Sequence, residues 1–286
     1  MSGCSDNVSG CLGSMSKVII PARIVANESR GGYYSLKVCL GAAEGELKLK
    51  PGQFIELGLG QSDLVLRRPF SVFQAKGCEL EILYQVVGEG TRRLRDMSMG
   101  TELSVMGPLG NCWPIPDESE AAGQRVLLLA GGIGAAPLAM LAEELLARDV
   151  RVKLILAARG RDWLCEYEWF QRLLPSDGLM VATDDGSVGV AGMITGPLDL
   201  VLQRDPSYDC AYICGPEPMM AACARRCNEE GLASWVSMER LMACGVGACL
   251  SCVAPTTKGL QRVCADGPVF AAKEVMWDEA RASRVR

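Results

Sequence analysis

The sequence predicts a multidomain β plus α/β protein: an antiparallel β-barrel, then a parallel α/β domain, then a small metal-binding segment at the C-terminus. Three observations indicate this order. Short β-rich runs occupy the chain to about residue 116, strands alternate with helices from residue 126 to residue 231, and cysteines crowd together after residue 243. A chain of 286 residues is long enough for two or three domains that each bury a core.

The composition excludes several classes of protein. Hydrophobic residues make up 49% of the chain and charges of both signs are interspersed, as in a folded protein. The formal net charge of −5 argues against a nucleic-acid partner. The chain contains no histidine, so the commonest general base and the commonest catalytic zinc ligand are missing. We therefore expect bound cofactors to supply any redox chemistry.

Fourteen cysteines do not indicate a secreted disulfide framework, because the chain is long and its first residues lack a signal peptide's basic and apolar regions. We expect a cytoplasmic protein. The run from Val126 to Ala142 is uncharged, but it is shorter than the ~20 residues of a membrane span and contains Gly131, Gly132, Gly134 and Pro137. We interpret it as a buried strand, a tight turn and the start of a helix, and expect no membrane association.

Residues 1–16 are predicted to be an N-terminal extension, and residues 17–120 the first domain. Its β-rich runs are separated by turns, with one short helix near residues 91–97. Strands at this spacing favour a small antiparallel barrel or sandwich, and we expect a barrel. The runs are KVIIPARIVAN, YYSLKVCL, GQFIELGLG, PFSVFQA, CELEILYQVV and TELSVMGP.

Residues 121–233 are predicted to form the second domain, in which strand and helix alternate. In its first helix Leu138, Leu141 and Leu145 share one face, as expected for a helix that packs on a sheet. The alternation predicts a parallel sheet with helices on both faces. Residues 234–286 are expected to hold the cysteine cluster and little regular structure.

Four cysteines near the C-terminus have the spacing C-x4-C-x2-C-x11-C: Cys244, Cys249, Cys252 and Cys264. The first three match the C-x4-C-x2-C run of plant-type [2Fe–2S] ferredoxins. Thiolates are the soft ligands that such clusters prefer, and the glycines and alanines between them suit a loop around a compact cluster. A structural zinc site and buried unliganded thiols are the alternatives.

Two stretches of the second domain are candidate nucleotide sites. Gly131, Gly132 and Gly134 lie where an apolar strand turns into a helix, and a helix N-terminus there can bind a pyrophosphate. A tight turn without a ligand is the alternative, because the glycines do not form a G-x-G-x-x-G fingerprint. A later strand of the same sheet ends in CGPEPMM, at the edge where open α/β sheets bind ligands.

Two stretches of the first domain could bind a phosphate or a planar ring. LRRPFSVF offers an arginine, an aromatic ring and a serine in sequence, and YQVVGEGTRRL places glycines and a threonine at a strand end. Ordinary strand and turn structure is the alternative for both.

The order of these motifs resembles a known family. RPFS, GEGT, GPLGN, AGGIGAAPL and CGPEPMM follow one another as in the ferredoxin–NADP reductase superfamily, in which a flavin-binding barrel precedes a nicotinamide-binding domain. With the appended MERLMACGVGACLSC and RVCADGPVF, the chain is most similar to the electron-transfer subunits of class 1B dihydroorotate dehydrogenases. The resemblance extends from Lys17 nearly to the end of the chain.

The resemblance implies three cofactors: FAD, NAD(H) and a [2Fe–2S] cluster. NADP is not excluded, because Arg159 and Arg161 could meet a 2′-phosphate. The implied FAD contacts are Arg68, Pro69, Phe70, Ser71, Gly90 and Thr91. The implied NAD(H) contacts are Gly131, Gly132, Gly134, Pro137, Cys214, Gly215 and Pro216. The implied cluster ligands are Cys244, Cys249, Cys252 and Cys264.

The resemblance also implies a function in pyrimidine biosynthesis. A catalytic partner subunit that carries FMN oxidises dihydroorotate, and electrons reach NAD+ through the cluster and FAD, in a complex with two copies of each subunit. We then expect no residue of this chain to act on the pyrimidine. Two alternatives remain: a reductase that serves an oxygenase, a ferredoxin or a sulfur compound, and a non-catalytic redox sensor.

Overall fold

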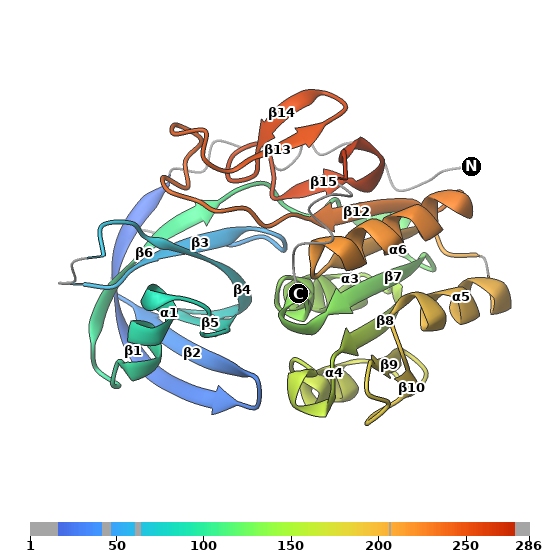
Figure 1. The fold of residues 1–286 in the computed structure, drawn as a ribbon, viewed down its shortest axis with the longest axis horizontal. Helices are drawn as coiled ribbons and strands as arrows, with labels where there is room; N and C mark the ends of the chain where they lie inside the picture. Colours follow the sequence, from blue (N-terminus) through green and yellow to red (C-terminus); the bar gives the residue numbers. More distant parts are fainter. Residues whose placement is uncertain (1–16, 42–46, 61–63, 206, 278–286) are drawn as a thin grey trace.

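The computed structural model describes residues 17–41, 47–60, 64–205 and 207–277. The predicted N-terminal extension, residues 1–16, lies outside the described residues. A β-barrel and an α/β domain lie side by side, and the C-terminal segment extends across the top of both (Figure 1). The segment therefore lies beside both larger parts of the molecule.

Six antiparallel strands close into the predicted barrel, in the order β1-β2-β5-β4-β3-β6. Alternate side chains such as Leu36, Ile55, Ile82 and Val105 are fully buried and fill its interior. The strands are β1 Val18–Arg30, β2 Tyr33–Leu40, β3 Phe54–Gly58, β4 Arg68–Lys76, β5 Glu79–Tyr84 and β6 Glu102–Leu109. The predicted short helix is α1, Glu89–Asp96, and its buried Leu94 packs against the barrel.

The second domain contains a seven-stranded sheet in the order β10-β9-β8-β7-β11-β12-β15. The first six strands are parallel and β15 is antiparallel to β12. The strands are β7 Arg125–Gly131, β8 Arg151–Ala158, β9 Leu179–Thr183, β10 Val190–Ala191, β11 Cys210–Cys214, β12 Ala233–Ser237 and β15 Val269–Ala271. The parallel α/β sheet predicted from the sequence is confirmed.

Helices cover both faces of this sheet, as predicted. Leu138 of α3 and Phe170 of α4 belong to the core on one face, whereas Leu198 of α5 and Met220 of α6 belong to the core on the other. The helices are α2 Glu118–Ala121, α3 Ala136–Ala147, α4 Tyr167–Leu173, α5 Thr195–Arg204 and α6 Glu217–Glu229. Short 3-10 turns are η2 Gly132–Ala135, η3 Arg161–Trp163 and η4 Ala272–Glu274. Within the described residues, no helix has the length and apolar character needed to cross a bilayer.

The expectation of little regular structure after residue 234 is wrong. Strands β13, Val253–Thr256, and β14, Gly259–Arg262, form a hairpin, and β15 joins the α/β sheet. These strands have three or four residues each, too few to show an alternating pattern in the sequence. The domain limits at residues 120 and 233 stay a prediction.

A single asparagine joins the end of the barrel to the C-terminal segment. Asn111, which is 5% exposed, follows β6. Its backbone N–H donates to the carbonyl of Gly267 at 2.7 Å, and its Nδ2 donates to the carbonyls of Asp266 at 3.1 Å and Val269 at 2.8 Å. Its Oδ1 accepts from the N–H of Val269 at 2.9 Å. Because β15 begins at Val269, these bonds connect the barrel to the edge of the α/β sheet.

We predict that Asn111→Ala lowers the apparent free energy of unfolding by about 3 kcal/mol, because it leaves a buried N–H and two carbonyls without these side-chain partners. Thermal unfolding followed by circular dichroism measures the loss. The matched control is Asn228→Ala on the exposed face of α6, which should change stability by less than ~0.5 kcal/mol. Equal melting of the two variants would contradict the prediction.

Candidate functional site

The two barrel motifs meet in space. Arg68, Pro69, Phe70 and Ser71 begin β4 and are half-buried, so their side chains are partly open to a ligand. A Cβ atom on Gly90 would lie 2.3 Å from Nε of Arg68. The arginine therefore lies directly against the first turn of α1, where any larger residue would displace it. An arginine beside a helix N-terminus combines two features that bind phosphate groups.

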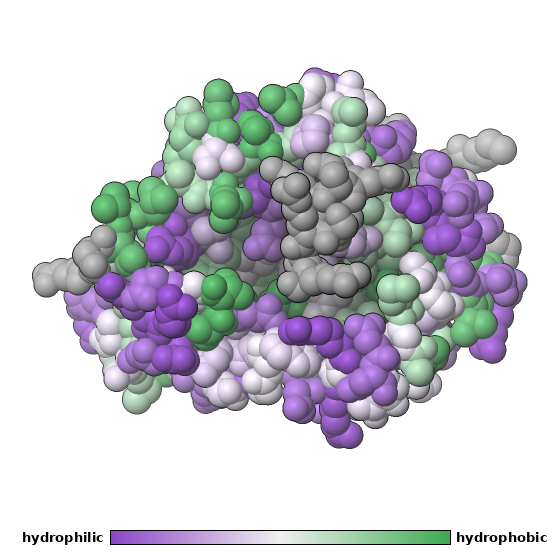
Figure 2. All heavy atoms as spheres, in the orientation of Figure 1, coloured by the Kyte–Doolittle hydropathy of each residue, from purple (hydrophilic) through white to green (hydrophobic). Residues whose placement is uncertain are grey.

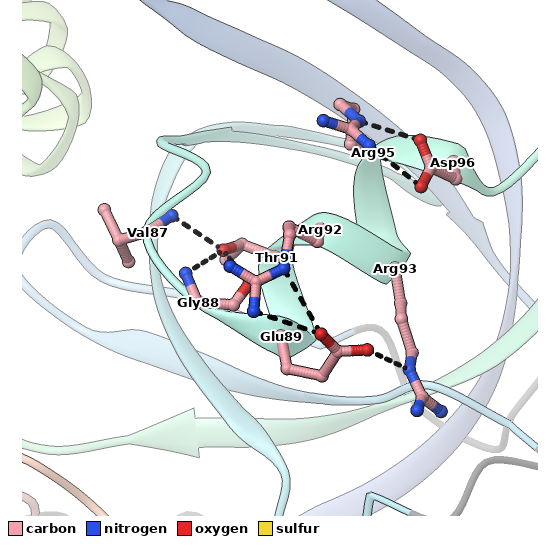
Figure 3. A network of polar contacts seen from close by, with 8 residues as sticks. All are labelled: Val87, Gly88, Glu89, Thr91, Arg92, Arg93, Arg95 and Asp96. Carbon is pink, nitrogen blue, oxygen red and sulfur yellow. Dashed lines mark hydrogen bonds and ion pairs between the residues drawn. The ribbon is translucent and has the colours of Figure 1, made fainter.

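Thr91 holds this turn in shape rather than pointing outward. Its Oγ1 accepts hydrogen bonds from the N–H groups of Val87 at 2.9 Å and Gly88 at 3.1 Å, and donates to the carbonyl of Gly88 at 3.1 Å (Figure 3). Glu89 forms ion pairs with Arg92 and Arg93 on the exposed side of the helix (Figure 3). Thr91 can thus assist a ligand through the backbone that it positions.

Three aromatic rings pack together beside the start of β4, the strand that is the candidate for binding a flavin. The ring of Phe70 meets Tyr84 edge-on at 6.1 Å, and Tyr84 stacks on Tyr34 at 5.4 Å. Burial raises the pKa of Tyr84 to about 12, so its hydroxyl stays protonated and donates to Oδ1 of Asn27 at 2.9 Å. Sequence reasoning missed Tyr34 and Tyr84. The sequence signal for them was a tyrosine in each of two predicted β-rich runs, YYSLKVCL and CELEILYQVV.

The glycines at the end of β7 and just after it serve two different purposes. A Cβ atom on Gly131 would lie 2.3 Å from Sδ of Met219, and one on Gly134 would lie 2.4 Å from the carbonyl oxygen of Cys214. Gly131 therefore leaves room for Met219 of α6, and Gly134 lets η2 pack closely against the end of β11. Gly132 has φ +52° and no atom within 4 Å of its Cβ position among the described residues, so its backbone faces open space. Gly132 is therefore the glycine of this turn that a pyrophosphate could approach.

The second candidate nucleotide stretch lies beside the first, because β11 pairs with β7 in parallel. A Cβ atom on Gly215 would lie 3.0 Å from Cα of Gly131, so the two strand ends meet closely. Cys214 and Gly215 are half-buried and Pro216 is exposed. Burial raises the pKa of Cys214 to about 12, so its thiol presents no charge to a bound ring.

Pro137 is buried in the first turn of α3. Its carbonyl accepts a hydrogen bond from Nε1 of Trp113 at 3.1 Å. Trp113 is 1% exposed and its ring also meets Tyr212 edge-on at 5.5 Å. The indole thus fixes the start of α3 against the chain that leaves the barrel, a role that sequence reasoning missed.

Arg159 and Arg161, considered for a 2′-phosphate, have defined contacts. The guanidinium of Arg159 lies 4.2 Å from the ring centre of Trp163. The backbone N–H of Arg161 donates to Oγ of Ser187 at 3.0 Å, and Arg161 lines a cavity of about 350 Å³ between the β1–β2 turn and α4. Both arginines therefore contact the chain itself just after β8.

The four C-terminal cysteines lie around one loop and hairpin. Cys252 and Cys264 are 2% and 1% exposed at the base of the β13–β14 hairpin, whereas Cys249 is exposed and Cys244 half-buried. Backbone N–H groups approach three of the sulfurs: Gly247 to Cys264 at 3.1 Å, Cys264 to Cys252 at 3.4 Å, and Cys249 to Cys244 at 3.4 Å. Donors of this kind stabilise thiolates and tune an iron–sulfur cluster.

The electrostatics of the loop differ from one cysteine to another. Burial opposes ionisation of Cys244, but N–H groups of Val246, Cys249 and Ala248 outweigh it and lower the pKa of its thiol to about 6. Burial raises the pKa of Cys264 to about 12. Within the described residues, no three cysteine or acidic side chains lie close enough to form a ready site for a single metal ion.

Backbone conformation and an ion pair shape the same loop. Gly245 and Gly247 have φ of +62° and +83°, which residues with side chains rarely adopt. Nη1 of Arg262 donates to the carbonyl of Gly247 at 3.2 Å, while its Nε and Nη2 bond both carboxylate oxygens of Asp266. Sequence reasoning missed Arg262 and Asp266. Soft thiols, N–H donors and a glycine cradle together fit an iron–sulfur cluster.

Known proteins match both the cysteine segment and most of the chain. Residues 239–276 match the model of the iron–sulfur cluster binding domain of dihydroorotate dehydrogenase B. The chain is 37% identical over 243 residues to the electron transfer subunit of dihydroorotate dehydrogenase B (NAD(+)) from Shouchella clausii, covering 82% of this chain and 90% of that protein. It is 39% identical over 233 residues to the subunit of the same name from Bacillus caldolyticus, covering 79% and 87%.

A solved structure is similar over almost the full length. It is described as an NADH-dependent reduced ferredoxin-NADP oxidoreductase studied for flavin-based electron bifurcation. The TM-score is 0.80, the sequence identity is 30%, and 96% of each chain is covered. The similarity therefore includes the C-terminal segment as well as the two larger domains.

We predict that Arg68→Ala weakens FAD retention roughly ten- to a hundredfold, because a charge-assisted phosphate contact contributes about 1.5–3 kcal/mol. Acid extraction of the flavin from purified protein measures occupancy, and circular dichroism checks the fold. Arg23→Ala is the control, since that arginine is exposed on the barrel and pairs with Glu102. Equal FAD content in the two variants would show that Arg68 does not bind the cofactor.

Proposed function

The chain belongs to the family of dihydroorotate dehydrogenase B electron-transfer subunits, and from this premise we propose that it passes electrons between an FMN-containing dihydroorotate dehydrogenase and NAD+ in pyrimidine biosynthesis. The observation that carries the proposal is the four-cysteine segment, which lies within the matched iron–sulfur domain. The relatives' shared name supports NAD+ as the nicotinamide cofactor and electron transfer as the activity.

The three cofactor groups supply complementary chemistry when bound: a nicotinamide exchanges two electrons as hydride, an iron–sulfur cluster passes one at a time, and a flavin does both. We assign FAD to the start of β4 and the first turn of α1, and NAD(H) to the adjoining ends of β7 and β11. We assign the cluster to Cys244, Cys249, Cys252 and Cys264. Two observations support these assignments. The side chain of Arg68 is half-buried and so partly open to a ligand, and the backbone of Gly132 faces open space.

The residues of this chain hold the binding segments in place and set the charge around them. The Thr91 hydroxyl holds the turn beside Arg68, and the Trp113 indole holds the first turn of the nucleotide helix. The protonated Cys214 thiol keeps the β11 edge uncharged. We propose no acid or base of this chain for the pyrimidine reaction, which the partner performs.

An exposed apolar surface surrounds the outermost cluster cysteine. Leu241, Leu250 and Val246 are 88%, 61% and 38% exposed on the loop that carries Cys249. Hydrophobic side chains gather over the segment between β12 and β13 (Figure 2). Leu250 has φ +60°, an uncommon conformation for a bulky residue. Contiguous exposed apolar side chains mark protein interfaces, and we propose this loop as the docking face for the catalytic subunit, in a complex with two copies of each chain.

One observation favours a second candidate function. The similar solved structure belongs to a reduced ferredoxin-NADP oxidoreductase and covers 96% of this chain, including the cluster segment. A reductase subunit that serves ferredoxin or another acceptor would use the same three sites. Only the partner distinguishes this candidate from the first.

We further propose a cytoplasmic location. An iron–sulfur cluster needs its ligand cysteines as thiolates, and a compartment that keeps thiols reduced preserves them.

We predict that Cys249→Ser loses iron and sulfide and abolishes dihydroorotate-dependent NAD+ reduction in the complex with an FMN-containing catalytic subunit, because serine is a harder and poorer iron ligand. Its FAD content and NADH oxidation by an artificial dye should persist, since the flavin site lies on the barrel. Cys78→Ser, an exposed cysteine of the barrel, is the matched control. Normal dihydroorotate activity in Cys249→Ser would contradict the assignment, and inactivity of the unmutated complex would favour the second candidate.

We predict that Leu241→Glu weakens co-purification of the catalytic subunit at least tenfold, because it places a charge on the apolar docking face. Titration of tagged partner against each variant measures the affinity. Met99→Glu is the control, since Met99 is 76% exposed but lies in the turn between α1 and β6 of the barrel. Equal binding by the two variants would place the docking face elsewhere.

A further inference from the structure

A buried glutamate on the barrel faces the cluster loop. Glu56 lies in the middle of β3 and is 1% exposed. Its neighbours Ile55 and Leu57 are fully buried in the barrel core, so the side chain at position 56 points outward from the barrel. In the sheet Glu56 pairs with Pro69 of β4 on one side and Met106 of β6 on the other. The residue therefore lies next to the start of the candidate flavin strand.

The carboxylate of Glu56 is not satisfied by the residues around it. Neither Oε1 nor Oε2 has a hydrogen-bond partner among the described residues. Arg67 acts on the carboxylate only at longer range, because its guanidinium donates to the carbonyl and the hydroxyl of Ser104. Burial raises the pKa of Glu56, with Arg67 opposing and Cys244 adding to the shift. A buried acid without partners is costly, so its presence calls for a functional explanation.

The side chain of Glu56 occupies the space beside Gly245. A Cβ atom on Gly245 would lie 2.6 Å from Cδ and Oε1 of Glu56 and 2.8 Å from Oε2. Gly245 follows Cys244 directly, and its φ is +62°. The glycine therefore lets the cluster loop rest on a carboxyl group of the barrel. Two independent observations, an unpartnered acid and a glycine shaped to it, meet at one contact.

We propose that Glu56 is a positioning residue of the iron–sulfur centre, which fixes the Cys244 loop against the flavin barrel and holds the reduction potential of the cluster down. The proposal rests on the proposed function for the presence of the cluster. Arg67 favours the ionised form of Glu56 against the effect of burial, and a negative charge beside a cluster ligand disfavours the added negative charge of the reduced state. It also gives the loop a rigid surface, which fixes the distance between the loop and the flavin strand.

The experiment compares Glu56→Gln and Glu56→Ala with the unmutated protein. Iron, sulfide and FAD are assayed in each preparation, circular dichroism checks the fold, and reductive titration followed by electron paramagnetic resonance gives the cluster potential. Glu81→Gln is the matched control. Glu81 is a second buried carboxylate of the barrel, on β5, where it accepts a hydrogen bond from Ser35 and lies near Lys37.

We expect Glu56→Gln to keep iron and FAD and to favour the reduced cluster about tenfold, an upward shift of about 59 mV for a one-electron couple. The amide removes the negative charge while keeping the shape. Glu56→Ala should lose part of its iron and keep its FAD, because the loop loses its support. Glu81→Gln should leave the potential unchanged.

Other results would overturn the proposal in distinguishable ways. An unchanged potential and iron content in Glu56→Gln would overturn this inference and leave the proposed function intact. Joint loss of FAD, iron and secondary structure in both Glu56 variants would reduce the residue to a folding role and would also overturn it. An unmutated protein without sulfide would overturn the proposed function itself.

Discussion

The hydrogen bonds of Asn111 join the three parts of the molecule at one point. One amide side chain, at the end of β6, satisfies carbonyls of Asp266 and Val269 and accepts from the N–H of Val269. Since Val269 begins the strand that pairs with β12, the barrel, the cluster segment and the α/β sheet share one junction. Buried amide groups are costly when unpaired, so this junction has little freedom to vary. The proposed flavin, nucleotide and cluster sites lie on the three parts that this junction joins.

Much of the fold could be predicted because its determinants are local. Short β-rich runs separated by turns predicted the barrel strands, and the helical spacing of Leu138 and Leu141 predicted a helix on a sheet. The cysteine spacing predicted a cluster segment, which the matched iron–sulfur domain confirms. Asn111 and Glu56 could not be found in this way. Their contacts join residues 158 and 189 positions apart, and such pairs leave no periodic trace in one sequence.

The cysteines illustrate how the surroundings, and not the residue type, set the chemistry. Backbone N–H groups around Cys244 favour its thiolate, whereas burial keeps Cys214 protonated. One environment suits the proposed metal ligand, and the other suits the uncharged edge of the proposed nucleotide site. The glycines of one turn also differ in role. Gly134 is required by close packing, whereas Gly132 faces open space. A motif therefore contains both structural and functional positions, and only the fold separates them.

The uneven burial of the four proposed cluster cysteines has a consequence for how a bound cluster would be shielded. Cys252 and Cys264 lie at the base of a hairpin and are almost completely buried, whereas Cys249 reaches the surface. A cluster on these cysteines would be covered by the hairpin on one side and open toward solvent at Cys249. Oxygen would reach it first from that open side, so a partner docked on the surrounding loop would also protect the centre.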